Sequence, residues 1–590
     1  MHQYDRRVRR LAPALLVILA ATPLLLASWT LAPTAFFAGD AGPKYLQAAA
    51  FARHQSWPRT IPYPAHVIDP SFRYLPVSMT AVHGRAVSFF PFLFPLIAAL
   101  GYPLAGRRAL LVLPALAALI AAWLVGRLAA RLGGGQRAVL PTAALALAAT
   151  PLMFYGSCIW AHSLVAAVVL GALELSLAAL GSQAPRDGTW IAAGILAGIA
   201  GWIRTEGFLF LALAAVPFVW QRDRTGLRGS LAAGTGGLLG VAAGAVLQRL
   251  ALGAWLPVHI VHVMDRHVFS VPFLTARFDT IRHLFVPDPW CGVALLIWFV
   301  ALILAFWRPH AASTTLLAMT AIAAGLAAAI GAPVVRFLEG TSPASAFPVR
   351  SATAVWVLLA ALPLALARAR PRDPAPRRAA MVIGSVAAGF VLVFILASPV
   401  DGGYQWGARL FLPVVLMLTA LLAARLAALR HPARLERAAI AATIAAAVLV
   451  QLFGMALLVH VTRGNAAFEA ALASQTGPGE TVVTDTFYLP ELGAPIWSAR
   501  RFLLLKSAHD VADLLGRLHA ARVRTWVFAS AGDVNLGLAP HIERAARTCG
   551  WRLATTRVLQ LPGRTLTLAR YTPSSSPGTR KTASSSRLPF

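Results

Sequence analysis

The stretch TLAPTAFFAGDAGPKYLQAAAFARHQSWP, residues 30–58, predicts how the first part of the chain meets a membrane. It overlaps the end of an apolar run, from Leu11 to about Pro33, that is long enough to cross a bilayer core of ~30 Å. A single carboxylate, Asp40, stands where the chain reaches water, at the start of a polar loop over about 34–85. The apolar run is too long for the core of a signal peptide, so we interpret it as a retained first helix.

The composition indicates an α-helical polytopic membrane protein. Of 590 residues, 58% are hydrophobic and 13% are charged, and the mean hydropathy is +0.68. Apolar stretches of about 17–24 residues, the length that spans a bilayer core, recur along most of the chain. We expect about 13 or 14 transmembrane helices within residues 1–461, with the loop 34–85 as the first extracytoplasmic loop.

The net charge of +30 is concentrated in short loops between the apolar runs. Arginine-rich loops are typical of the cytoplasmic side, because they resist translocation and meet anionic lipid there. We therefore exclude nucleic acid as a partner and place the N-terminus in the cytoplasm. Arg107 and Arg127 cannot both be cytoplasmic if a single helix separates them, so a segment within 86–130 is either re-entrant or miscounted.

The character of the sequence changes after residue 461. Residues 462–572 combine strand-like runs with the amphipathic pattern HDVADLLGRLHAARVRTWVFAS, which predicts a small soluble α/β domain. The tail over 573–590, PSSSPGTRKTASSSRLPF, has low complexity and is predicted to be disordered.

Asp40 is the leading candidate for chemistry, because a carboxylate at the mouth of a helix bundle can act as a base or as a metal ligand. Aspartate is also a favoured N-cap, and the next residues can start a helix, so capping is an alternative that is compatible with catalysis. Lys44 lies one helical turn later, where its ammonium can pair with Asp40 or bind phosphate.

The rest of the first loop interleaves aromatic residues with acids and histidines. This mixture suits sugar recognition, in which apolar sugar faces stack on rings and hydroxyls need hydrogen-bond partners. An aromatic belt at the membrane interface is the alternative. We take Asp69 as the second acid and Arg73 as a substrate-binding residue; the other members are Tyr63, His66, Tyr74 and His83.

Polar residues also interrupt later apolar sequence. Arg204 and Glu206 are unfavourable there unless they are paired or face a cavity, and a solvated pair in a short loop is the alternative. Asp265 is interpreted as lining of the active site. His259 and His262 share one helical face, which permits metal binding or phosphate contact, and a structural role is the alternative. Gln405 and Arg409 precede an apolar helix, where a guanidinium suits a lipid phosphate or simply snorkels.

Three stretches together resemble the GT-C superfamily of integral-membrane glycosyltransferases, in particular bacterial relatives of protein mannosyltransferases and aminoarabinose transferases. The order and spacing of the stretches carry this resemblance, which covers roughly residues 8–460. A fourth stretch is similar to the helix end that reaches toward the active site in that superfamily. The four are FFAGDAGPKYLQAA (36–49), AGILAGIAGWIRTEGFLFLA (193–212), GGYQWGARLFLPVV (402–415) and, as the fourth, ALAATPLMFYGSCIW (146–160).

The resemblance implies transfer of a sugar, with inversion, from a polyprenyl-phosphate donor to an extracytoplasmic glycolipid, polysaccharide or protein acceptor. Asp40 would act as the base, and Arg409 or Lys44 would stabilise the leaving lipid phosphate. It also implies an enzyme of the inner (plasma) membrane, among membrane lipids, with its active site on the extracytoplasmic side. Many relatives carry a second acid where Ala41 stands here, so we assign no metal ligand and leave a divalent cation as an open alternative.

The C-terminal domain resembles the extracytoplasmic α/β domains attached to some of these enzymes, where Asp485 and Glu491 would help to select an acceptor. Two other classes share the main features. A transporter or flippase of lipid-linked sugars also has many helices and membrane-embedded charges, but it requires neither a long first loop nor a terminal soluble domain. A non-catalytic membrane scaffold of the same fold is the other alternative, because a fold does not by itself imply activity.

Overall fold

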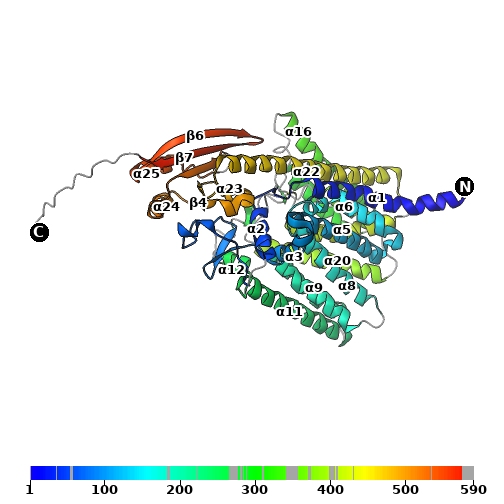
Figure 1. Ribbon diagram of the computed structural model, residues 1–590. Helices are drawn as coiled ribbons and strands as arrows, with labels where there is room; N and C mark the ends of the chain where they lie inside the picture. The colour runs from blue at the N-terminus through cyan, green and yellow to red at the C-terminus, as the bar shows by residue number, and fades with distance from the viewer. Residues whose placement is uncertain are drawn as a thin grey trace, which may run out of the picture. The chain divides into compact units, whose positions relative to one another are not determined.

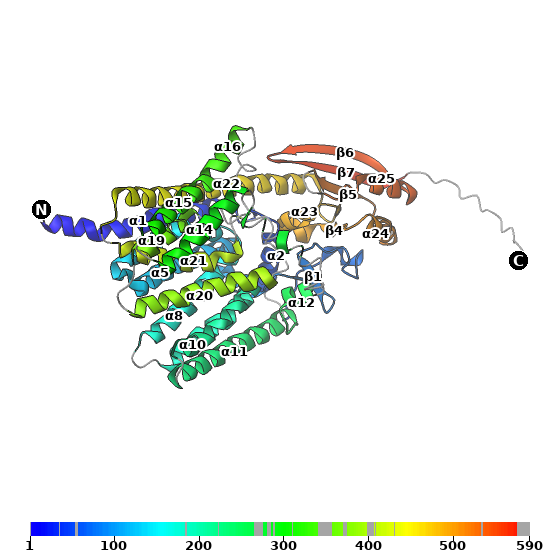
Figure 2. The same cartoon turned by 180° about the vertical axis from the view of Figure 1, so that it is seen from behind.

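The computed structural model of the chain divides into two units (Figures 1 and 2). Unit 1 comprises Met1–Ile61 and Ser78–Ala466, and unit 2 comprises Pro62–Val77 and Ala467–Phe590. The structure describes residues 2–574 apart from 35, 54–56, 183–185, 222–223, 265–274, 276, 280–281, 283–284, 287–288, 309–310, 340–356, 370–373, 398–405, 407–408, 430 and 533–534.

Unit 1 is built from helices with one small hairpin. Its elements are α1 (His2–Thr30), α2 (Ala41–Ala52), β1 (Met79–Val82), β2 (Arg85–Ser88), α3 (Leu93–Leu100), α4 (Tyr102–Ala105), η2 (Gly106–Arg108), α5 (Ala109–Ala129), η3 (Ala130–Gly134), η4 (Gln136–Ala138), α6 (Val139–Ala149), α7 (Leu152–Gly156), α8 (His162–Leu180), α9 (Asp187–Ile203), η5 (Thr205–Ala215), α10 (Val216–Gln221), α11 (Arg224–Leu252), α12 (Val258–Met264), α14 (Pro289–Trp307), α15 (Ala312–Leu326), η6 (Ala327–Gly331), α16 (Ala332–Leu338), α19 (Leu362–Arg368), α20 (Pro374–Ala397), η7 (Arg409–Phe411), α21 (Leu412–Ala427) and α22 (Arg434–Gln475), which continues into unit 2.

The prediction of a polytopic membrane protein is confirmed. Among the described residues, 8 helical segments are long and apolar enough to cross a membrane: Tyr102–Gly134, His162–Leu180, Arg224–Leu252, Pro289–Trp307, Ala312–Leu338, Ala375–Leu396, Arg409–Ala427 and Arg434–Gln475. Shorter apolar helices occupy Ala14–Thr30, Asp187–Ile203, Thr205–Ala215 and Val357–Arg368. The total of 13 or 14 spans stays a prediction.

Within the region 86–130, the apolar residues near 86–104 do not form a helix long enough to span a membrane. α3 has 8 residues and α4 has 4, and at 1.5 Å per residue neither reaches across a bilayer core of ~30 Å. The Arg107 guanidinium lies 5.5 Å from the ring centre of Tyr45 in α2, whereas Arg127, in the last turn of α5, pairs with Glu174 at 3.3 Å. The two arginines therefore lie at opposite ends of α5, and the two alternatives for the segment before it, a re-entrant or a miscounted helix, both stay predictions.

Helices α9 and α11 lie side by side and pack backbone to backbone (Figure 1). A Cβ atom added at Gly194 would lie 2.0 Å from the Ala233 carbonyl oxygen, and one at Gly236 would lie 2.1 Å from that of Ile191. Small residues allow such close approach, and van der Waals contact then stabilises the helix pair within lipid. Another part of the α11 surface exposes leucines, including Leu238, as expected for a surface that faces lipid.

Gly236→Ala should lower the free energy of unfolding of the purified protein by about 1–3 kcal/mol, because the added methyl group overlaps backbone that cannot move away. The matched control is Gly234→Ala on the same helix, where an added Cβ meets nothing within 4 Å. Thermal unfolding in one detergent compares the two variants. Equal stabilities would contradict backbone-to-backbone packing of α9 and α11.

Unit 2 contains a five-stranded mixed sheet of strand order β4-β3-β5-β7-β6. β3 pairs in parallel with β4 and β5, and β7 pairs in antiparallel fashion with β5 and β6. The predicted α/β pattern is confirmed in its elements. They are η1 (Pro64–Val67), β3 (Thr481–Thr484), α23 (Leu489–Leu492), η8 (Ala494–Ala499), β4 (Arg501–Leu504), α24 (His509–Ala520), β5 (Trp526–Ala531), α25 (Ala539–Thr548), β6 (Trp551–Leu561) and β7 (Arg564–Pro573).

Part of the first loop belongs to unit 2. The N–H of Leu504, at the end of β4, donates to the Tyr74 carbonyl at 2.9 Å, and Ala65 and Ile68 are buried in the same core as Leu514 of α24. The structural boundary thus falls at 466/467 rather than at the predicted 461/462, with residues 62–77 added to the second unit. The predicted disorder of the tail concerns residues that, from 575 onward, lie outside the described part of the chain.

Candidate active site

Asp40 is the last residue before α2, and its side chain binds a distant arginine. The carboxylate makes no capping hydrogen bond to α2. Instead the Nη1 atom of Arg409, at the start of η7, donates to Asp40 Oδ2 at 3.1 Å. The Asp40 side chain remains 32% exposed and that of Arg409 is 11% exposed. A carboxylate aimed at a guanidinium and still open to solvent is placed to meet a ligand.

Two further cations lie near this pair. Lys44 is buried in the first turn of α2, with its Nζ atom 3.8 Å from the ring centre of Phe90. Arg204, between α9 and η5, forms an ion pair with Glu206, and both side chains are largely buried. Lys44 and Arg204 act electrostatically on Asp40. Among the described residues named here, three cations against two carboxylates leave one net positive charge, which favours an anionic ligand.

The cationic neighbours control the ionisation of Asp40. Burial raises the pKa of its carboxyl, but the Arg409 guanidinium, the Lys44 ammonium and the Arg204 guanidinium together hold that pKa below its usual value. Asp40 is therefore ionised at neutral pH. An ion or group that draws Arg409 away would raise the pKa and make the carboxylate a stronger base.

An aromatic wall supports the Arg409 side chain. Its guanidinium carbon lies 4.8 Å from the ring centre of Trp160, whose ring stacks on Tyr155 at 5.8 Å. Next to them is His162, the first residue of α8, which is buried and has no hydrogen-bond partner at either ring nitrogen among the described residues. No local sequence pattern marks Tyr155, Trp160 or His162 as site residues, although the stretch 146–160 resembles a helix end at an active site.

An apolar cavity of about 1090 Å³ lies between η5 with α10 on one side and α20 on the other. Its described lining is apolar except for Ser385 and Arg378. The wall continues toward the site, because Phe210 stacks on Phe390 at 4.8 Å and Phe390 contacts Phe411 at 6.0 Å, two residues after Arg409. The volume lies just above the range for small-molecule sites, about 300–1,000 Å³.

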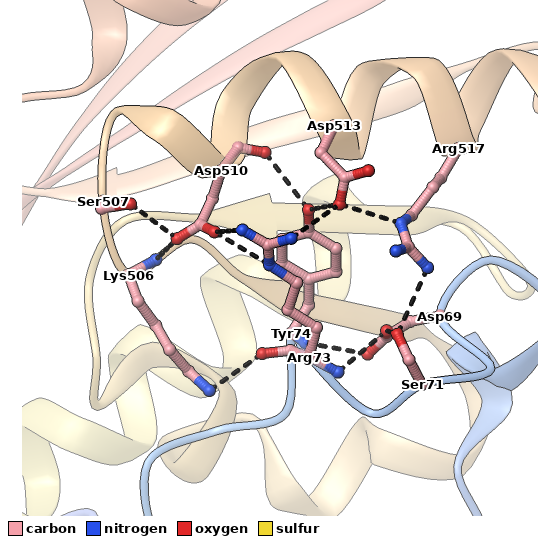
Figure 3. Close-up of polar contacts among 9 residues, drawn as sticks. All are labelled: Asp69, Ser71, Arg73, Tyr74, Lys506, Ser507, Asp510, Asp513 and Arg517. Atoms are coloured by element: carbon pink, nitrogen blue, oxygen red, sulfur yellow. Dashed lines mark hydrogen bonds and ion pairs between the residues drawn. The ribbon is translucent and has the colours of Figure 1, made fainter.

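Asp69 and Arg73, predicted to bind substrate, lie in unit 2 and are engaged there (Figure 3). Asp69 is buried and accepts hydrogen bonds from the backbone N–H groups of Arg73 and Tyr74, at 2.9 and 2.8 Å. The Arg73 guanidinium pairs with Asp510 of α24 at 2.8 Å, and the Tyr74 hydroxyl donates to Asp513 at 2.6 Å. These contacts attach residues 62–77 to α24, and substrate binding by Asp69 or Arg73 stays a prediction.

The remaining predicted residues divide into two groups. Asp485 and Glu491 are buried in unit 2, and Asp485 Oδ2 accepts from the N–H of Leu538 at 3.1 Å, so the contact of Asp485 is internal to the fold. Asp265 and Gln405 lie outside the described residues. In the part of the chain that is described, no three His, Cys, Asp or Glu side chains are grouped to hold a metal, and a divalent cation stays an open alternative.

No family model matches the chain, and no curated protein matches it. Among solved structures, it is similar to ArnT from Cupriavidus metallidurans in the apo state, with 18% identity, a TM-score of 0.45, and coverage of 94% of this chain and 97% of that chain. ArnT bound to undecaprenyl phosphate has a TM-score of 0.43 and the same identity and coverage.

The chain is also similar to the Archaeoglobus fulgidus oligosaccharyltransferase in the apo form, with 11% identity, a TM-score of 0.46, and coverage of 88% of this chain and 69% of that chain. Both proteins are GT-C glycosyltransferases, the superfamily that the sequence stretches resemble. At these identities the similarity concerns the fold alone, so function has to be inferred from the residues of the site.

The acidic side of the pH–rate profile should report the Asp40–Arg409 pair. In the native protein Asp40 stays ionised until the pH falls below the usual range of a carboxyl, because its pKa is lowered. Arg409→Gln removes the strongest opposing charge, so the pKa of Asp40 should rise and activity should be lost at a higher pH than in the native protein. The measurement is kcat/KM against pH, for the sugar transfer that the sequence predicts, in both proteins. An unchanged acidic limb would show that Asp40 is not the titrating base.

Tyr74→Phe should weaken the attachment of residues 62–77 by about 1 kcal/mol at neutral pH, because it removes the hydroxyl that donates to Asp513. That hydrogen bond, with Arg517, lowers the pKa of Asp513 despite partial desolvation. The stabilisation is thus present above the unfolded-state pKa and is lost as pH falls through the folded-state pKa. The protection of the Leu504 amide from hydrogen exchange measures this stabilisation. The difference in protection between the native protein and Tyr74→Phe should become smaller on acidification, and a difference that stayed constant would contradict this assignment.

Proposed function

We propose that this protein is a membrane glycosyltransferase that moves a sugar from a polyprenyl-phosphate donor to an extracytoplasmic acceptor with inversion at the anomeric carbon. The observation that carries the proposal is the partly exposed Asp40 carboxylate paired with Arg409, with Lys44 and Arg204 beside them. A base next to a group of cations suits a reaction in which a hydroxyl loses a proton while a phosphate departs.

The proposed reaction is a single displacement. Asp40 accepts the proton of the acceptor hydroxyl as its oxygen bonds to the anomeric carbon and the bond from that carbon to the phosphate oxygen breaks. The lipid phosphate leaves with the electron pair, stabilised by Arg409 and Lys44. Binding of the donor phosphate to Arg409 weakens the pairing with Asp40, which raises the pKa of the base when a donor is present.

The apolar cavity supports a lipid-linked donor. It is bordered by η5, which begins directly after Arg204, and by α20, whose Phe390 contacts Phe411 near Arg409. An isoprenoid chain in this cavity would bring its phosphate to the cationic site. A soluble nucleotide-sugar donor has no hydrocarbon chain to fill such a surface.

The charge distribution supports an extracytoplasmic site in an inner (plasma) membrane. Arg127 and Arg131 pair with Glu174 at the end of α5 that lies away from α2. Gly133, close to them, approaches Pro376 at the start of α20, next to Arg377 and Arg378. We place this end in the cytoplasm together with the basic N-terminus, which would leave Asp40, with Arg107 and Arg108, on the other side.

The test is sugar transfer by the lipid-reconstituted full chain from a panel of radiolabelled polyprenyl-phosphate sugars, with and without EDTA, to glycolipid, polysaccharide and peptide acceptors. Asp40→Asn should lower transfer or donor hydrolysis at least ~100-fold, the range expected for a lost general base. The matched control is Asp187→Asn, which removes an exposed carboxylate paired with Arg228 and should leave the rate unchanged.

Donor movement across the vesicle bilayer at equal rates in the native protein and the Asp40→Asn variant, without transfer, would indicate a transporter of lipid-linked sugars instead. Binding of donor without transfer or movement in either protein would indicate a scaffold. Loss of transfer on adding EDTA would establish that a divalent cation takes part.

A further inference from the structure

Trp406 is held at three points close to Arg409. Its indole N–H donates to Gln451 Oε1 on α22 at 2.9 Å, and its backbone carbonyl accepts from the Tyr155 hydroxyl on α7. The indole ring lies against Gly454, where an added Cβ atom would be 2.4 Å from the ring. The side chain is fully buried. These contacts fix the chain three residues before the guanidinium of the candidate site.

The same aromatic cluster also contacts the Arg409 side chain. Trp406 stacks on Phe154, the neighbour of Tyr155 in α7, at 5.9 Å. Tyr155 in turn stacks on Trp160, the ring beneath the Arg409 guanidinium. The segment from Phe154 to Trp160 therefore contacts both Trp406 and the charged end of Arg409. Movement of Tyr155 or Trp406 would be transmitted to the guanidinium.

The chain just before Asp40 is held by the same two parts of unit 1. Asn465, also on α22, donates through Nδ2 to the carbonyl oxygens of Phe36 and Phe37, at 2.6 and 3.1 Å. The Phe37 ring meets Phe154 and Trp160 edge to face, at 5.0 and 5.7 Å. Helix α22 and the segment 154–160 thus contact the chain a few residues before each member of the Asp40–Arg409 pair.

We propose that Tyr155, Gln451 and Gly454 are positioning residues that act through Trp406 to hold Arg409 at Asp40 and at the donor phosphate. The identity of the substrate in this proposal rests on the function proposed above, whereas the positioning of Arg409 does not depend on that function. A displacement of about 1 Å at a reacting group can lower a rate ~100-fold. These three side chains are therefore expected to control catalysis without touching the substrate.

The first experiment is a double-mutant cycle between Tyr155→Phe and Arg409→Ala, measured on the reconstituted full chain with a polyprenyl-phosphate sugar. Tyr155→Phe removes only the hydroxyl, and we expect kcat/KM to fall about tenfold through weaker donor binding and misplacement of Arg409. In the Arg409→Ala background the same change should alter kcat/KM less than about twofold, because the group that it positions is gone. Equal losses in both backgrounds would overturn the proposal.

The second experiment does not depend on activity. Gly454→Ala places a methyl group in the Trp406 ring, and an experimentally determined structure of this variant should show the Arg409 Nη1 to Asp40 Oδ2 distance beyond about 4 Å, the limit of an ion pair. Gly384→Ala on α20 is the matched control, since an added Cβ there meets nothing within 4 Å. An unchanged Arg409 in the Gly454→Ala variant would overturn the proposal.

The two experiments separate the possible failures. If Arg409 is displaced in Gly454→Ala but the native protein transfers no sugar, the positioning role stands and the proposed function fails. If the native protein transfers sugar while Arg409 keeps its place in the variant, the proposed function stands and the positioning role fails. Thermal unfolding first checks that each purified variant is folded. If Gly454→Ala does not fold, the structure of Tyr155→Phe is determined in its place.

Discussion

A charge at the edge of a low-dielectric helix bundle is stable only when an opposite charge or water compensates it, and the organisation of unit 1 around Asp40 follows from this constraint. Asp40 and Arg409 are 369 positions apart and meet at 3.1 Å. Lys44 and the Arg204–Glu206 pair complete the charge balance. Because the set retains one net positive charge, it is suited to hold an additional anion.

The aromatic residues around the pair give this electrostatic arrangement a fixed geometry. An arginine side chain has many rotamers, and holding one of them requires packing as well as charge. Trp160 lies beneath the guanidinium. Trp406 donates a hydrogen bond to Gln451, and its ring packs against Gly454, where a side chain would leave it no room. The result is a preorganised cation, which contributes more to a reaction than one that must be ordered when the substrate binds.

The first loop serves both units. Its start carries Asp40 and α2, whereas residues 62–77 add Tyr74 to the edge of the unit 2 sheet and Arg73 to the carboxylates of α24. The Asp69 carboxylate accepts hydrogen bonds from the backbone N–H groups of Arg73 and Tyr74, and so stabilises the turn that positions these two residues. The polar character of the loop, which suggested sugar recognition, is explained in this part of the loop by packing against α24.

The lengths of the apolar runs were sufficient to predict the polytopic class, and the period of α24 was sufficient to predict the α/β character of unit 2. Charged residues beside apolar runs marked Asp40, Lys44 and Arg409 as candidate site residues. All of these predictions depend on local composition and spacing. Only the tertiary structure showed that Asp40 pairs with Arg409 rather than capping α2, that residues 62–77 join unit 2, and that Trp160 and His162 lie at the site. Contacts between residues hundreds of positions apart depend on how the helices pack, which no local pattern encodes.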